Sequence, residues 1–114
     1  MFGLKSEQIA AIDQCFEKYP EIDLAIIYGS RAKNTYRYNS DIDLTLIGDL
    51  SFRQLLKLEN ELDDLLLPYK IDLSLKSTIS NADLIEHIDR VGKIFYDKSR
   101  KINSAKVASG ERVD

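Results

Sequence analysis

Cysteine, tryptophan and proline are scarce in this sequence of 114 residues, which contains one cysteine, no tryptophan and two prolines. The single cysteine, Cys15, excludes an internal disulfide and is typical of proteins from a reducing compartment. No apolar run approaches the ~20 residues that span a bilayer, and the first residues lack the long apolar stretch of a secretory signal. We therefore expect a cytoplasmic protein with no membrane-bound part.

Basic residues are too few for a broad nucleic-acid-binding surface. The sequence has 16 lysines and arginines against 19 acidic residues and a net charge of -3, so direct nucleic-acid binding is not expected. Positive charge gathers only in residues 98–114, which hold five basic and two acidic residues and few apolar ones. We expect one domain at 1–97, followed by a polar, basic and disordered tail at 98–114.

The spacing of apolar residues predicts an α+β domain. Helical spacing predicts three helices, with N-caps at Ser6, at Ser51, and at Ser80 or Asn81. Short apolar or alternating runs predict strands at 24–28, 41–47, 71–75 and 94–96. The simplest arrangement is a small mixed β-sheet with helices packed on its one apolar face.

Three aspartates lie on the polar faces of the two alternating strands. Asp41 and Asp43 are two residues apart, so a strand would project both from one face with Cα atoms about 6.5–7 Å apart. Asp72 has the same place in the next strand and would join them if the two strands are neighbours. Bare carboxylates in such a group repel one another, whereas Mg²⁺ prefers carboxylate, water and phosphate oxygens. The pattern predicts a site for one or two magnesium ions.

A tight turn precedes these aspartates. Gly29 follows a buried strand and allows the backbone to approach a phosphate, and the Ser30 hydroxyl can donate to a phosphate oxygen. Arg31 could add a charge-assisted bond to the phosphate or pair with a surface acid, and the sequence leaves both roles open. Each part is common by itself, but the turn, its spacing and the three carboxylates together form a specific pattern.

Residues 28–44 resemble the nucleotidyltransferase motif of the DNA polymerase β-like superfamily. The spacing of Gly29-Ser30, ten residues and then Asp41-x-Asp43 is similar to that of the minimal nucleotidyltransferases. These proteins are encoded beside a small helical protein of the HEPN class, as two-protein or toxin–antitoxin pairs. The resemblance covers about residues 5–97 and implies the polymerase β-like nucleotidyltransferase core.

The resemblance also implies an activity and its residues. The chain would use Mg²⁺ and transfer AMP from ATP to a hydroxyl, with a tyrosine of the HEPN protein as the acceptor in toxin–antitoxin members. By similarity, the catalytic and metal-binding carboxylates would be Asp41, Asp43 and Asp72, and the residues that bind the nucleotide phosphates would be Gly29 and Ser30. Asp72 would contact the ion of the attacking group or accept its proton. The alternative is a non-catalytic module that binds a nucleotide or neutralises the HEPN protein by steric capping.

Two features depart from the family pattern. Asn34 stands where these proteins often have glycine, although asparagine also tolerates a left-handed backbone. Larger relatives carry an added helical domain that helps to hold the acceptor, and 114 residues leave no room for one. We expect a HEPN subunit, or a second copy in a homodimer, to complete the site.

His87, the only histidine, is interpreted as a partly packed surface residue.

Overall fold

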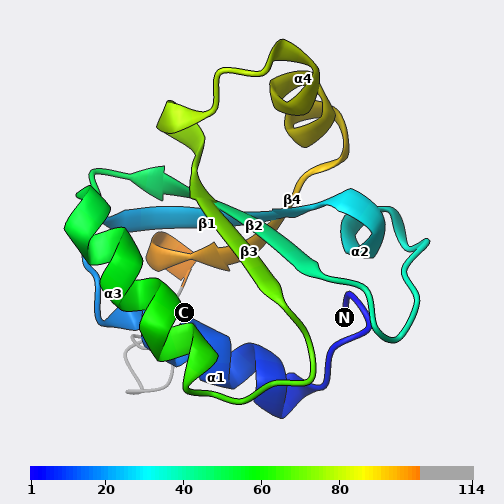
Figure 1. Ribbon diagram of the computed structural model, residues 1–114, viewed down its shortest axis with the longest axis horizontal. Helices are drawn as coiled ribbons and strands as arrows, with labels where there is room; N and C mark the ends of the chain where they lie inside the picture. The colour runs from blue at the N-terminus through cyan, green and yellow to red at the C-terminus, as the bar shows by residue number, and fades with distance from the viewer. Residues whose placement is uncertain (101–114) are drawn as a thin grey trace, which may run out of the picture.

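A four-stranded sheet with the order β3-β2-β1-β4 lies at the centre of the computed structural model, which describes residues 1–100 (Figure 1). Its strands are β1 (Ile22–Tyr28), β2 (Ile42–Gly48), β3 (Ile71–Leu75) and β4 (Lys93–Asp97). β1 pairs antiparallel with β2 and β4, and β3 pairs parallel with β2. The predicted mixed sheet is confirmed, with the fourth strand at the edge beside β1.

Two helices, α1 (Ser6–Glu17) and α3 (Phe52–Asp63), pack on the apolar face of the sheet (Figure 1). The strands alternate as predicted, because Ile42, Leu44 and Leu46 of β2 are fully buried in the core while Asp43 lies on the other face. Helices α1 and α3 contribute to the same core through Ile12, Phe16, Leu58 and Leu62.

None of the helices within residues 1–100 combines the length and the apolar character that a membrane span needs.

The predicted helix starts agree with the structure for α3 and for α4 (Ala82–Val91), but not for α1. Ser51 Oγ accepts a hydrogen bond from the Gln54 N–H at 3.1 Å, and the Asn81 side chain caps α4 in the same way. In α1 the N-cap is Lys5, and Ser6 is already helical. The N–H groups of Gln8 and Ile9, which a Ser6 cap would satisfy, both donate to the Lys5 carbonyl at 3.0 Å.

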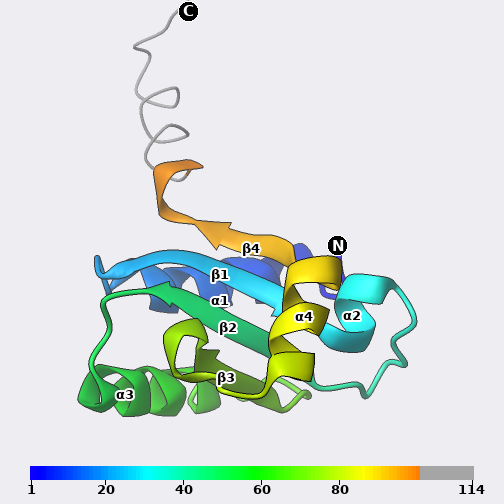
Figure 2. The same ribbon diagram turned by 90° about the horizontal axis from the view of Figure 1, so that it is seen from above.

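The other side of the sheet carries α4. A 3₁₀ turn, η1 (Lys76–Thr78), leads from β3 to this helix, which contacts β1 and the short helix α2 (Gly29–Lys33). Figure 2 shows α4 in front of the sheet and α1 behind it. Ile88 is buried where α4 contacts the sheet, yet it does not belong to the main core. α4 therefore covers one end of the polar face, which places it beside the predicted site.

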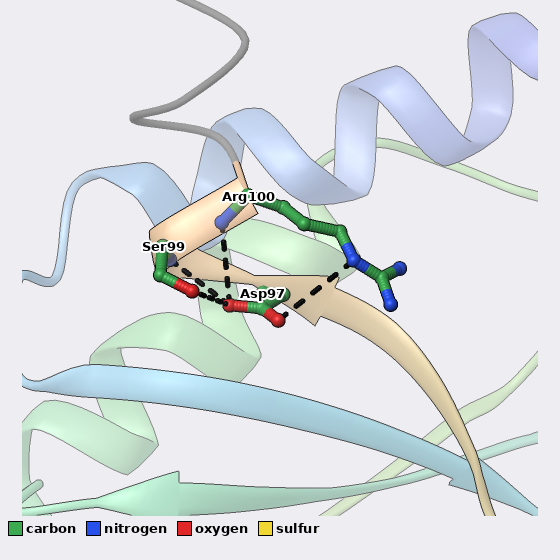
Figure 3. Close-up of polar contacts among 3 residues, drawn as sticks. All are labelled: Asp97, Ser99 and Arg100. Atoms are coloured by element: carbon green, nitrogen blue, oxygen red, sulfur yellow. Dashed lines mark hydrogen bonds and ion pairs between the residues drawn. The ribbon is translucent and has the colours of Figure 1, made fainter.

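Asp97 organises a turn directly after β4. Its Oδ1 atom accepts from the Ser99 hydroxyl at 2.7 Å and the Ser99 N–H at 2.9 Å, and the Arg100 guanidinium lies beside Oδ2 (Figure 3). The Ser99 hydroxyl is the main cause that lowers the pKa of Asp97, because the hydrogen bond favours the ionised carboxylate. The chain thus stays ordered for a few residues beyond the last strand.

The predicted tail at 98–114 lies mostly outside the described residues. Of its first three residues, Lys98 contacts the folded domain, because its Nζ atom donates to the Pro20 carbonyl at 2.7 Å. Residues 101–114 are those that the structure does not describe, so the domain boundary expected after residue 97 stays a prediction.

Candidate nucleotide and metal site

Strand pairing brings the predicted carboxylates together. Asp43 of β2 and Asp72 of β3 are direct partners in the parallel ladder, so their side chains leave the same face of the sheet. Asp41 precedes β2 by one residue and is exposed, as is Asp72, whereas Asp43 is half-buried. The prediction that these strands are neighbours is confirmed, and the three carboxylates form one group because of it.

The electrostatics of this group are those of crowded like charges. Burial raises the pKa of Asp43, and the nearby negative charges of Asp72 and Asp41 raise it further. His87 and Lys70 oppose this rise in the pKa without cancelling it. The ionised group is therefore unfavourable by itself, and a bound cation would remove the repulsion.

The three aspartates fit a divalent cation by their chemistry. Within residues 1–100, no three histidine, cysteine or acidic side chains are arranged around one metal position. The donor set nevertheless consists of carboxylate oxygens, which Mg²⁺ prefers, and their mutual repulsion favours a cation among them. Asp41, Asp43 and Asp72 are thus suitable magnesium ligands whose coordination geometry is not preformed.

Gly29 follows β1 directly and lies beside this group of carboxylates. Its φ angle of 73° lies in the left-handed region, which glycine adopts without strain. A Cβ atom placed on Gly29 would collide with Oδ2 of Asp43. The backbone conformation therefore favours glycine, and a side chain at this position would have to displace the Asp43 carboxylate. Ser30 follows at the start of α2 and is half-buried.

Asn34 ends α2 in the left-handed conformation that its residue type allows. Its φ and ψ angles are 63° and 28°, and its N–H donates to the Ser30 carbonyl. The predicted tolerance of asparagine for this backbone is confirmed. The turn that begins at Gly29 is thus closed by a second left-handed residue.

Arg31 has a different role from the phosphate contact that the sequence suggested. Its side chain is buried, with 2% of its surface exposed. The guanidinium donates to the carbonyls of Phe2 at 3.0 Å and Ser40 at 2.8 Å. Its Cζ atom also lies 4.6 Å from the centre of the Tyr69 ring, a cation–π contact. These groups enclose the guanidinium, so its structural role replaces both surface roles considered from the sequence.

Arg31 thereby joins the segments that carry the site. It starts on α2 directly after Ser30, and it holds the loop that leads to Asp41 through the Ser40 carbonyl. Tyr69 precedes β3, the strand of Asp72. One buried side chain thus links the turn to both loops that enter the carboxylate-bearing strands.

A row of hydroxyl groups lies next to the carboxylates, and sequence reasoning gave it no role in the site. Tyr28 is the β1 partner of Asp43, and its pKa is raised by burial and then by Asp43 and Asp72. A hydrogen bond with Ser74 partly opposes that rise. Ser74 in turn donates to Thr45 Oγ1 at 3.0 Å. The alternation of the strands predicts Ser74 and Thr45 on this face, since each lies two residues after an aspartate.

His87 is the second group that sequence reasoning missed. Its Nε2 atom accepts a hydrogen bond from the Gly29 N–H at 3.2 Å. The imidazole ring also makes an edge-on contact with Tyr28, with ring centres 6.2 Å apart. The predicted partial packing is confirmed, but the packing partners belong to the site. No local pattern could have shown this, because 58 residues separate His87 from Gly29.

The collision at Gly29 leads to a testable prediction. We expect Gly29→Ala to reduce nucleotide transfer by about 100-fold, because displacing reacting groups by about 1 Å can have an effect of that size. The added methyl group would push Asp43 away from its position. Initial rates of transfer measure the effect.

Asn34→Ala is the matched control for this prediction. Both positions have left-handed φ angles, so alanine strains the backbone at either by about 1–2 kcal/mol. Only the alanine at position 29 meets a carboxylate of the site. Equal losses of activity in the two variants would contradict the steric explanation.

The comparisons with known proteins agree with this geometry. The model of the family described as polymerase beta, nucleotidyltransferase matches residues 10–101. A search among curated proteins gave no significant match.

Among solved structures, several toxin–antitoxin complexes contain a chain with a similar fold. One complex with AMP-PNP matches with a TM-score of 0.63 and 21% identity over 96% of this chain and 93% of that one. A tri-AMPylated Shewanella oneidensis HEPN toxin in complex with an MNT antitoxin matches with a TM-score of 0.62, 17% identity and coverages of 88% and 78%. The MntA–HepT complex matches with a TM-score of 0.61, 18% identity and coverages of 95% and 92%. Since the family model matches most of the chain and the fold agrees, this chain belongs to the polymerase β-like nucleotidyltransferase family.

Proposed function

We propose that this protein is a magnesium-dependent nucleotidyltransferase that transfers AMP from ATP to a hydroxyl group of a partner protein. The partner would be a HEPN-class toxin, the acceptor one of its tyrosines, and this chain the antitoxin. The observation that carries the proposal is the pairing of Asp43 with Asp72 on neighbouring strands, next to a glycine turn that leaves room for no side chain. The AMPylated toxin in a similar complex supports the choice of AMP and of a protein acceptor.

The nucleotide would bind at the Gly29–Ser30 turn. Gly29 presents only backbone there, and the Ser30 hydroxyl can donate to a phosphate oxygen. Asp41, Asp43 and Asp72 would hold magnesium, which neutralises charge on the phosphates and favours ionisation of the acceptor hydroxyl when it is bound.

Asp72 would serve the acceptor. It lies on β3, the edge strand of the sheet, and its side chain is exposed, so a group from another protein can reach it. In the reaction a bond forms between the acceptor oxygen and the α-phosphorus, the bond from that phosphorus to the bridging oxygen breaks, and pyrophosphate leaves. The Asp72 carboxylate would accept the hydroxyl proton, directly or through water.

A second candidate function is neutralisation of the toxin by steric capping. The observation behind it is that chains of similar fold occur in complexes with toxins, an arrangement that capping alone would also use. The two candidates differ in their requirement for ATP.

Intact mass of the partner tests the proposal. The toxin encoded beside this chain is incubated with the purified protein, with ATP and Mg²⁺, with ATP and a chelator, or with α,β-methylene ATP, which cannot release AMP. We expect mass gains of whole AMP units with ATP and Mg²⁺ only, together with loss of toxin activity. Loss of toxin activity without any mass gain would contradict transfer and support capping.

A further inference from the structure

The phosphate-binding turn is contacted by one side chain from a distant part of the chain. The Gly29 N–H donates to His87 Nε2 at 3.2 Å, which joins the end of β1 to α4. Because Nε2 accepts a hydrogen bond here, the proton of the neutral ring is on Nδ1. This bond sets the direction of the Gly29 amide and therefore the orientation of the backbone that enters Ser30.

His87 is held in place independently of this hydrogen bond. The next residue, Ile88, is 3% exposed and anchors α4 on the sheet. Close packing between Gly92 and Ile26 holds the C-terminal end of the helix, where a Cβ atom on the glycine would collide with Ile26 Cγ2 at 2.7 Å. The imidazole also packs edge-on against Tyr28. Removing the imidazole would therefore leave α4 docked, and its contribution to the turn can be measured separately.

The position of His87 agrees with a role in the site and not only in packing. Its ring is half-buried and packs against Tyr28, which is the β1 partner of Asp43. Gly29 itself has a left-handed backbone that a glycine can leave easily, since glycine has the largest conformational freedom. A hydrogen bond from a rigid helix restricts that freedom.

We propose that His87 is a positioning residue, which holds the Gly29–Ser30 turn in the conformation that receives the nucleotide phosphates. The inference rests on the proposed function for the identity of the ligand. It also predicts the sign of an effect. A positioning residue strengthens nucleotide binding. If instead the phosphate needs the Gly29 N–H, then His87 acts as a blocking residue, because it occupies that N–H and weakens nucleotide binding.

Three variants of the full chain separate these cases. His87→Ala removes the acceptor, His87→Gln returns an acceptor oxygen near the position of Nε2, and Glu86→Ala is a control at an exposed position of the same helix. The dissociation constant of α,β-methylene ATP with Mg²⁺ is measured by calorimetry. Hydrogen exchange of the Gly29 amide is followed by NMR without nucleotide.

The expected results follow from the loss of one hydrogen bond. His87→Ala should bind the nucleotide analogue about fivefold more weakly, and its Gly29 amide should exchange about tenfold faster. His87→Gln should recover most of both losses, and Glu86→Ala should match the wild type. In transfer assays the KM for ATP should rise while the KM for the acceptor stays unchanged.

Two results would overturn the inference. Tighter nucleotide binding by His87→Ala would show that His87 blocks the Gly29 N–H. An unchanged rate of hydrogen exchange at the Gly29 amide would show that His87 does not hold the turn. If no variant, including the wild type, binds the nucleotide analogue, the proposed function fails. The amide exchange then still decides whether His87 positions the turn.

Discussion

Replacement of Asp43 by asparagine is expected to lower the rate of AMP transfer by about 1,000-fold, equivalent to about 4 kcal/mol of transition-state stabilisation. Asp43 is the half-buried member of the carboxylate group, placed between Tyr28 and Asp72 in the sheet. Asparagine has nearly the same shape but lacks the charge that a bound cation requires, and metal-ion catalysis contributes several kcal/mol. Initial rates of AMP incorporation into the partner, measured with saturating ATP, give the loss directly.

Asp49→Asn is the control for this variant. It removes the same charge from an exposed loop after β2 and should leave the rate unchanged. A transfer rate for Asp43→Asn within tenfold of the wild type would contradict a catalytic role for this carboxylate. Full neutralisation of the toxin by Asp43→Asn would instead favour the capping function.

The stability of Asp43→Asn provides a check that the variant folds. The pKa of Asp43 is raised in the folded state by burial and by Asp72, so the ionised carboxylate reduces stability at neutral pH. We therefore expect the variant to be at least as stable as the wild type at pH 7. The difference should vanish as the pH falls below 3.8, the ordinary pKa, because the wild-type carboxyl is then protonated in both states. Thermal unfolding across this pH range, without divalent cations, tests the sign.

Removal of the Arg31 side chain should have the largest effect on stability. Arg31→Ala leaves the Phe2 and Ser40 carbonyls without their donor, opens a cavity and removes the contact with Tyr69. We expect a loss of about 3 kcal/mol in the free energy of unfolding, since each buried unpaired group costs about 1–3 kcal/mol and recovery of arginine hydration offsets part of the total. Urea unfolding followed by circular dichroism measures it.

Two further variants define the cause of this loss. Arg31→Lys keeps the charge but cannot reproduce the planar guanidinium. Its loss in the free energy of unfolding should be more than half of the loss expected for Arg31→Ala. Arg90→Ala removes an exposed arginine paired with Glu86 and should change stability by less than about 0.5 kcal/mol. If Arg31→Ala were as stable as the wild type and had lost only nucleotide binding, the phosphate role predicted from the sequence would be correct after all.

Several features of the fold could be predicted because they depend on neighbouring residues. Alternation along β2 and β3 assigns Asp43 and Asp72 to the polar face whatever lies around them. The capping residues Ser51 and Asn81 act within one turn of their helices, and both predictions hold. The α1 prediction failed at Ser6 because the N–H groups that a serine cap would satisfy donate to the Lys5 carbonyl instead.

The sequence by itself assigned Asp43 and Asp72 to the polar faces of their strands and Gly29 to a turn, because strand periodicity and glycine geometry are local properties, while the resemblance implied the polymerase β-like core. Only the tertiary structure showed which groups Arg31 and His87 contact. A guanidinium or an imidazole serves equally well at a surface, in a core or beside a ligand, and its residue type does not choose among them. That choice depends on which distant segments meet: the N-terminus and two loops around Arg31, and the Gly29 turn against α4.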